Sequence, residues 1–189
     1  MPISAPYTLQ LSNVAFGYES ITRDYRCVRI NRNTSTMTNS IESDVMVYSL
    51  KDDSWRKAAT PNVPYNLRFL GCYNTDSVFL NGAIHWYGFI NEPLRNVSIV
   101  TFNLREECFS TLPVPNLVSI GIGRMFVGVL DGSLCLVVNE SWGDTHLWVM
   151  KEYGIPESWT KLFSFAKLNT SVSNEHMNWN CNVLVNVSI

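Results

Sequence analysis

Charged side chains are scarce in this chain of 189 residues. Lys, Arg, Asp and Glu together make up 16% of it, whereas soluble domains average about 25%. There is no basic excess either, because the formal net charge is −2. Nucleic-acid surfaces need clustered Lys and Arg, so the composition argues against that class of protein. The deficit suits a β-rich protein with much buried strand, for which 46% apolar residues supply a core.

Cysteine pairs and metal-ligand spacings are also lacking. The five cysteines stand alone, without a CxxC pair: Cys27, Cys72, Cys108, Cys135 and Cys181. This pattern favours reduced, mostly buried thiols in an intracellular protein, with disulfides as the alternative. The histidines are far apart: His85, His146 and His176. We therefore expect structural histidines, no metal site and no cofactor.

Targeting and membrane signals are missing as well. The N-terminus has no basic segment followed by a long apolar one, so a signal peptide is not predicted. The longest apolar stretch, Leu117 to Leu130, contains Arg124 and several glycines and is too short to span a bilayer. We expect a cytoplasmic or nuclear protein without membrane contact.

Catalytic motifs are absent: the chain has no HExxH, no GxSxG and no phosphate-binding glycine loop. Two acidic pairs, Asp52-Asp53 and Glu106-Glu107, could be imagined as paired carboxylates. Each follows a Lys or Arg at the same place in a repeat, which favours solvated turns. No catalytic residue is predicted.

What the chain does contain is a motif written three times. The copies are YSLKDDSW at Tyr48–Trp55, FNLREECF at Phe102–Phe109 and WVMKEYGIPESW at Trp148–Trp159. Each reads aromatic, any residue, aliphatic, basic, acidic, turn, aromatic. The first aromatic positions lie 54 and 46 residues apart (102 − 48 and 148 − 102), a period typical of propeller blades.

Each copy predicts a β-hairpin. The aromatic and aliphatic residues alternate and so point to one face of a strand, while the charged pair forms the turn. The first aromatics, Tyr48, Phe102 and Trp148, are therefore expected in equivalent buried sites. Two further tryptophans in repeat columns, Trp55 and Trp159, are expected in the core.

The surrounding residues extend each hairpin to four strands. Asn81-Gly82 and Asp131-Gly132 predict tight type I′ turns between the first two strands of the second and third units. The polar stretch Asn31 to Ser43 predicts a loop in the first unit. We expect an all-β protein, with Asn182 to Ile189 as one strand of an unfinished fourth unit.

Seven motifs in order and in register with the repeat carry a family likeness. They are FGYES followed by DYRCVRI, VYSLKDDSWR, FLNGAIHW, FNLREECFSTLPVP, LDGSLCLV and LWVMKEYGIPESWTKLF. Together they resemble the F-box-associated interaction domain of plant F-box proteins. The resemblance implies a kelch-like β-propeller of about three four-stranded antiparallel blades plus a partial one, in an open or truncated ring. The implied domain covers residues 11–165, between an N-terminal extension (1–10) and a divergent tail (166–189).

The resemblance also implies a function, which is to bind target proteins for an SCF-type cullin–RING ubiquitin ligase without catalysis. A Skp-type adaptor and cullin would be partners only if an F-box is supplied elsewhere, since only ten residues precede Leu11. The alternatives are an orphan receptor fragment without ligase function and, less favoured, an enzyme on a propeller scaffold. A truncated ring leaves blade edges open, so self-association is also expected.

Blade topology indicates where a target would bind. The loops between the second and third strands of each unit are long and dissimilar, whereas the other end of the second and third units has tight turns, and rigid strands with variable loops are typical of recognition surfaces. The alternative is that these loops are merely solvated linkers. The predicted protein-binding residues are Asn91, Glu92, Arg95, Asn139, Glu140, Trp142 and Asp144.

Overall fold

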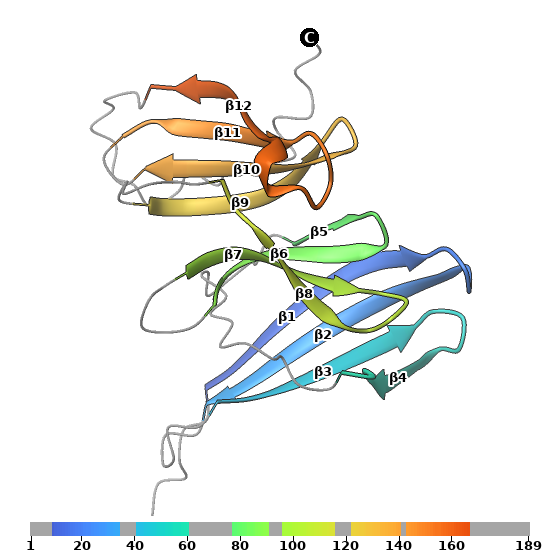
Figure 1. Ribbon diagram of the computed structural model, residues 1–189. Helices are drawn as coiled ribbons and strands as arrows, with labels where there is room; N and C mark the ends of the chain where they lie inside the picture. The colour runs from blue at the N-terminus through green and yellow to red at the C-terminus, as the bar shows by residue number, and fades with distance from the viewer. Residues whose placement is uncertain are drawn as a thin grey trace, which may run out of the picture. The chain divides into compact units, whose positions relative to one another are not determined.

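The computed structural model describes residues 9–34, 41–60, 77–90, 96–115, 122–140 and 143–166. Within these ranges it consists of three four-stranded antiparallel sheets, each with its strands in chain order, and contains no α-helix (Figure 1). The predicted all-β, propeller-like architecture is therefore confirmed. None of the described helical segments is long and apolar enough to cross a membrane. The chain divides into two compact units, Met1–Thr111 and Leu112–Ile189, which are described separately below.

Blade 1 contains β1 (Leu9–Glu19), β2 (Asp24–Thr34), β3 (Ile41–Ser49) and β4 (Ser54–Lys57). The predicted loop from Asn31 to Ser43 is wrong at both of its ends, and residues 35–40 between them lie outside the described residues. Strand β2 runs on to Thr34 and β3 begins at Ile41, with Asn31 paired to Asp44 and Thr34 to Ile41. Pairing between β2 and β3 supplies hydrogen-bond partners to the backbone N–H and C=O groups whatever the polarity of the side chains. A polar composition therefore does not by itself indicate a loop.

Blade 2 contains β5 (Ser77–Leu80), β6 (Ala83–Ile90), β7 (Asn96–Asn103) and β8 (Phe109–Pro113). Blade 3 contains β9 (Ile122–Leu130), β10 (Ser133–Glu140), β11 (Thr145–Met150) and β12 (Trp159–Phe165), with a short 3-10 turn, η1 (Pro156–Ser158), before β12. Both predicted type I′ turns are confirmed. Asn81 and Gly82 have φ of 50° and 77°, and Asp131 and Gly132 have 48° and 71°, the positive values that this turn requires.

A shared core holds blades 1 and 2 together. One face of blade 1 contributes Val28, Ile30, Val45 and Val47, and blade 2 contributes residues that include Ile84, Trp86, Phe102 and Leu104. Gly17 in β1 permits this close approach. A Cβ atom at Gly17 would lie 2.5 Å from Phe79 and 2.6 Å from Leu104, below any normal contact.

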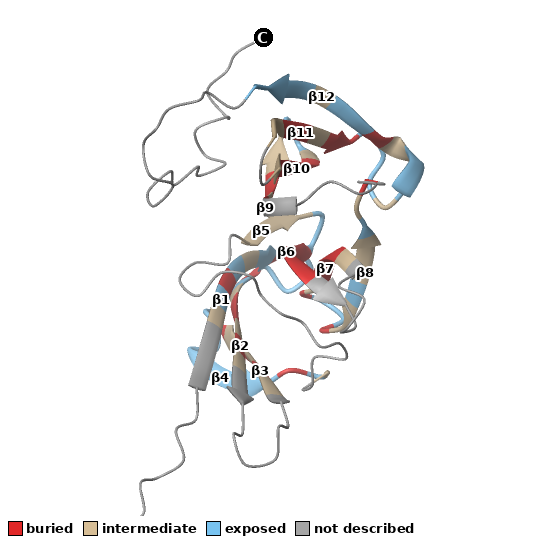
Figure 2. Cartoon of the chain, turned by 90° about the vertical axis from the view of Figure 1, so that its left-hand side faces the viewer, coloured by how far each residue is buried: buried red, intermediate tan, exposed pale blue. Residues whose placement is uncertain are grey.

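The apolar residues of the repeated motif are buried in blade 2 but largely exposed in blade 1. Phe102 and Leu104 are fully buried, whereas their counterparts Tyr48 and Leu50 are half-buried and 58% exposed. The expectation that Tyr48 is buried like Phe102 is therefore wrong, and so is the expected core position of Trp55, which is 43% exposed. The cause is positional: blade 1 covers this face of blade 2, while the same face of blade 1 points away from blade 2. Figure 2 shows the exposure of β4, where Trp55 lies.

Blade 3 has its own apolar cluster, formed by Cys135, Val137, Leu147 and Val149. Trp159 is buried as predicted, and its indole N–H donates to the Pro113 carbonyl over 2.9 Å. Trp148 is only half-buried, with the Lys161 ammonium 5.2 Å from its ring centre. The described cysteines, Cys27, Cys108 and Cys135, are free thiols; Cys72 and Cys181 lie outside the described residues.

Glu107 corrects the reading of the acidic pairs as solvated turns. It is 4% exposed and accepts bonds from blade 1: Arg56 binds both carboxylate oxygens, one over 2.8 Å, and the Ala59 amide donates over 2.8 Å. Arg26 adds a contact at 3.4 Å. Burial on its own raises the pKa of Glu107, but these hydrogen bonds and positive charges outweigh it and the net pKa is lowered. The turn thus clamps blade 2 to blade 1.

His85 confirms the structural role expected for it. The ring is fully buried in blade 2, with Nδ1 3.3 Å from the Val78 carbonyl. Burial lowers the pKa of His85 to about 4, against a smaller opposing effect of backbone hydrogen bonds with Val78 and Ala83. The folded protein therefore keeps a neutral imidazole at a pH where the unfolded chain is protonated.

This burial predicts an acid-sensitive fold. Because the unfolded histidine takes up a proton below about pH 6.5 and the folded one does not, stability falls as pH falls. Between pH 7 and pH 5 the loss is expected to be about 2 kcal/mol in urea unfolding experiments. A His85→Gln variant is expected to be less stable at pH 7 but to lose less over the same interval. An unchanged pH dependence in that variant would show that another group is responsible.

Candidate protein-binding site

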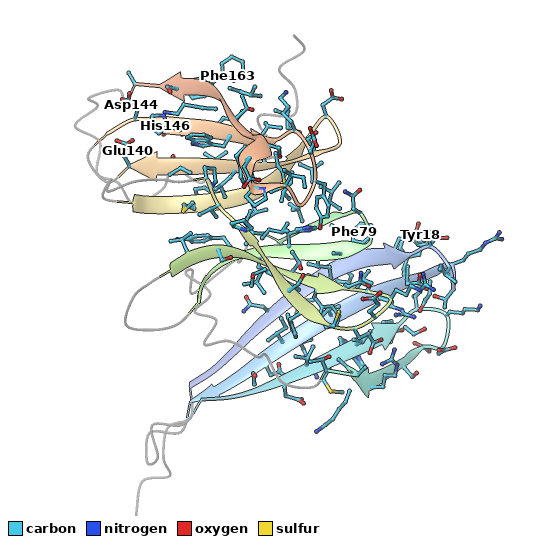
Figure 3. All side chains as sticks on the ribbon, in the orientation of Figure 1. Tyr18, Phe79, Glu140, Asp144, His146 and Phe163 are labelled. Atoms are coloured by element: carbon cyan, nitrogen blue, oxygen red, sulfur yellow. The ribbon has the colours of Figure 1, made fainter. Side chains whose placement is uncertain are left out.

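The described part of the predicted site is the loop between β10 and β11 in blade 3. Asn139 and Glu140 end β10, and Asp144 precedes β11, so the strands bring these three predicted residues together at one end of the blade. Figure 3 shows Glu140 and Asp144 there, beside His146. The other four, Asn91, Glu92, Arg95 and Trp142, lie outside the described residues.

Backbone and side-chain bonds close this loop. The Thr145 hydroxyl donates to the Asn139 side-chain oxygen over 2.9 Å, and the Glu140 amide donates to the Asp144 carbonyl over 3.1 Å. A β-bulge lies between Asn139 and Glu140 where β10 pairs with β9, and bulges commonly re-aim side chains at strand ends. These bonds join the two described ends of the loop, and we call the bonded residues at these ends the frame of the loop.

His146 and Ser164 complete the frame, and sequence reasoning did not connect them with the site. Nε2 of His146 lies 2.6 Å from a Glu140 carboxylate oxygen, and Nδ1 lies 3.0 Å from the Ser164 hydroxyl. His146 is 8% exposed. The three side chains thus tie the loop, β11 and the outer strand β12 together. The register places Ser164 opposite His146, a pairing that requires knowing where β12 bulges.

Gly143 is also part of the loop's construction. A Cβ atom there would lie 2.0 Å from the second carboxylate oxygen of Glu140. Any side chain at this position would displace Glu140 from its place beside His146. Gly143 therefore leaves room for the Glu140 carboxylate, and His146 holds that carboxylate by a hydrogen bond.

Some polar side chains of the loop are already hydrogen-bonded within the chain, and others can still bind a partner. Glu140 is committed to His146, and the Asn139 oxygen is committed to Thr145. The Asn139 amide can still donate. Asp144 is half-buried, and its carboxylate makes no ion pair or side-chain hydrogen bond within the described part of the chain. The loop thus offers a donor and an acidic acceptor on a fixed frame. No group of three or more His, Cys, Asp or Glu side chains that could hold a metal ion occurs among the described residues.

Comparison with known proteins identifies the chain's relatives. A family model described as the F-box associated beta propeller domain matches residues 3–185. The chain belongs to the F-box associated β-propeller family. It is 32% identical over 177 residues to the F-box protein CPR1 of Arabidopsis thaliana, covering 85% of this chain and 42% of that protein.

Two further Arabidopsis thaliana relatives agree with this assignment. F-box protein At3g07870 is 29% identical, covering 80% of this chain and 39% of that protein. F-box/kelch-repeat protein At3g23880 is 25% identical, covering 83% and 41%. The chain therefore spans about two fifths of the length of the curated relatives it matches, and no F-box is found within it.

Proposed function

We propose that this F-box associated domain is a non-catalytic substrate-recognition module of an SCF-type ubiquitin ligase. The observation that carries the proposal is the family match over residues 3–185, together with relatives that are named F-box proteins. Its partner is a target protein for ubiquitination. A Skp-type adaptor and cullin join the assembly where an F-box is supplied elsewhere, in the cytoplasm or nucleus.

The target is proposed to contact the loops between the second and third strands of the blades. In blade 3, the Asn139 amide and the Asp144 carboxylate are the described groups available for such a contact. The bonds among Glu140, His146 and Ser164 support this role because they fix the end of β10, where the loop begins, to β11 and β12. A frame ordered in advance lowers the entropic cost of binding.

The contacts among Ser164, His146 and Glu140 suggest an alternative function, an enzyme on the same scaffold. Hydrolases order a nucleophilic serine, a histidine and a carboxylate in the same sequence of contacts. Here the histidine is buried and bridges a loop to an outer strand, which is a structural use of both ring nitrogens. We therefore assign this bonded set to support of the loop.

The proposal is tested by target capture. The chain is expressed with an affinity tag in plant cells under proteasome inhibition, and co-purifying proteins are quantified by mass spectrometry. Replacing the seven predicted residues by alanine is expected to remove at least one captured protein that carries ubiquitin. Asp144→Ala alone is expected to weaken the same capture.

A matched control uses the opposite end of blade 3. Glu152 and Glu157 are exposed in the turn between β11 and β12, so replacing both by alanine should leave capture unchanged. Loss of capture in this control, or none in the loop variant, contradicts the assignment of the loops. Capture of a protein that is never ubiquitinated would favour a receptor fragment without ligase function.

A further inference from the structure

The face of blade 1 that points away from blade 2 is built like a covered face but carries exposed side chains. Successive residues of a strand point to opposite sides of a sheet, and the pairing register places six large apolar side chains on this side. They are Val14, Phe16, Tyr18, Tyr25, Tyr48 and Trp55. We call this set the outer face of blade 1. Phe16 is 71% and Tyr25 63% exposed, which is unusual for a contiguous aromatic patch.

Blade 2 shows what the same repeat positions do when they are covered. Tyr48 and Trp55 have their rings 5.3 Å apart and tilted by 47°; the corresponding Phe102 and Phe109 are 4.9 Å apart and tilted by 58°. In blade 2 this pair packs into the core shared with blade 1. The outer face of blade 1 thus has the shape of a sheet-packing surface without a sheet upon it in the described residues.

The charged turns extend the equivalence. Asp53 stands at the repeat position of Glu107, and both adopt the left-handed conformation, with φ of 47° and 51°. Glu107 reaches to the neighbouring blade and binds two arginines. Asp53 accepts a bond from the Tyr48 hydroxyl but has no arginine within ion-pair distance among the described residues.

Arg29 is a further charged residue on the same face. Arg29 pairs with Met46 and Val14 in the register and so points to the outer face. Its guanidinium lies 4.7 Å from the ring centre of Trp55, and Nε is buried without a hydrogen-bond partner. No carboxylate lies within ion-pair distance of it in the described part of the chain.

We propose that the outer face of blade 1 binds the outer face of a second copy of this chain, related by a two-fold axis. Arg29 and Asp53 lie on one face, separated along the strand direction by roughly 10 Å or more at about 3.3 Å per residue. A two-fold axis between them brings Arg29 of each copy to Asp53 of the other. Asp53 then binds an arginine of the facing sheet, as Glu107 does between blades 1 and 2. Aromatic residues and arginine are the types enriched at the centre of such interfaces. This proposal does not depend on the receptor function.

The first test is oligomeric state. Sedimentation velocity and light scattering at micromolar concentration are expected to give twice the chain mass of 21.5 kDa. Phe16→Glu and, independently, Tyr25→Glu are expected to give monomers, because either places a carboxylate in the apolar centre of the contact. Phe163→Glu is the matched control, since Phe163 is a 47% exposed aromatic on β12 of blade 3, and it should remain dimeric. A monomeric wild-type chain, or equal dissociation by the control, overturns the proposal.

A charge exchange tests the pairing itself. Arg29→Asp and Asp53→Arg are each expected to be monomeric, because each homodimer would set like charges opposite one another. Mixing the two variants should restore a dimer, since both contacts then join an aspartate to an arginine. Circular dichroism of each variant confirms that it is folded before mixing. Two folded variants that stay monomeric when mixed overturn the Arg29–Asp53 pairing.

Discussion

Phe102→Ala is expected to lower the free energy of unfolding by about 3–5 kcal/mol, the usual loss when a buried phenylalanine is truncated. Phe102 has no exposed surface, and its ring packs against Phe109 in the core that joins blades 1 and 2. Truncation therefore removes apolar contacts and leaves a cavity between two sheets. Urea unfolding followed by circular dichroism at pH 7 measures the change.

The repeat supplies the control for this experiment. Tyr48 stands at the same position in blade 1 but is only half-buried, so Tyr48→Ala should cost about 1 kcal/mol. Both changes are best measured in the Phe16→Glu background, where no second copy covers the outer face. Equal losses of stability for Tyr48→Ala and Phe102→Ala would mean that the two side chains are equally buried, contrary to the structure.

The sequence predicted most of the strands because its signals are local. Alternating apolar residues and the Asn81-Gly82 and Asp131-Gly132 turns depend on neighbouring residues, and the structure has them where expected. The repeat also identified Phe102 as a core residue. The repeat does not distinguish a position that a neighbouring blade covers from one that no blade covers, so it predicts Tyr48 and Trp55 in the core together with Phe102 and Trp159.

The positions of polar residues are harder to predict from the sequence, because the environment of a polar side chain depends on partners far away in the chain. Asn31 and its neighbours looked like a loop, yet pairing between β2 and β3 places them in a sheet. In the candidate site, Asn139, Glu140 and Asp144 were expected on chain order alone. Their connection to His146 and Ser164 depends on the register of β11 and β12, which the sequence does not display.

Glu107 is the clearest case of this limit. It follows Arg105 and Glu106 in a charged turn, and its nearest chain neighbours give no sign of burial. Its partners are 81 and 51 residues away, at Arg26 and Arg56. A carboxylate is tolerated in this buried place because two arginines and a backbone amide replace its hydration.

Glu107→Ala is accordingly expected to cost about 2–4 kcal/mol, since it leaves the Ala59 amide unsatisfied and Arg26 short of one partner. The upper end of the range for buried pairs is not expected, because Arg56 is half-exposed and can be hydrated again. Glu106→Ala, at the exposed neighbouring residue, should change stability by less than about 0.5 kcal/mol. Similar losses for the two variants would contradict the clamp between blades 1 and 2.

The pH dependence of the Glu107→Gln variant separates charge from shape. The lowered pKa of Glu107 means that its contribution is complete above the pKa of the unfolded chain, about 4.3, and is lost as pH falls through the folded value. The stability difference between wild type and Glu107→Gln should therefore be constant from pH 7 to about pH 5 and shrink below pH 4. His85, by contrast, acts between pH 7 and pH 4 and is common to both proteins, so it cancels in the difference. A difference that persists undiminished at the lowest pH would show that packing, and not the ion pairs of Glu107, joins the two blades at this turn.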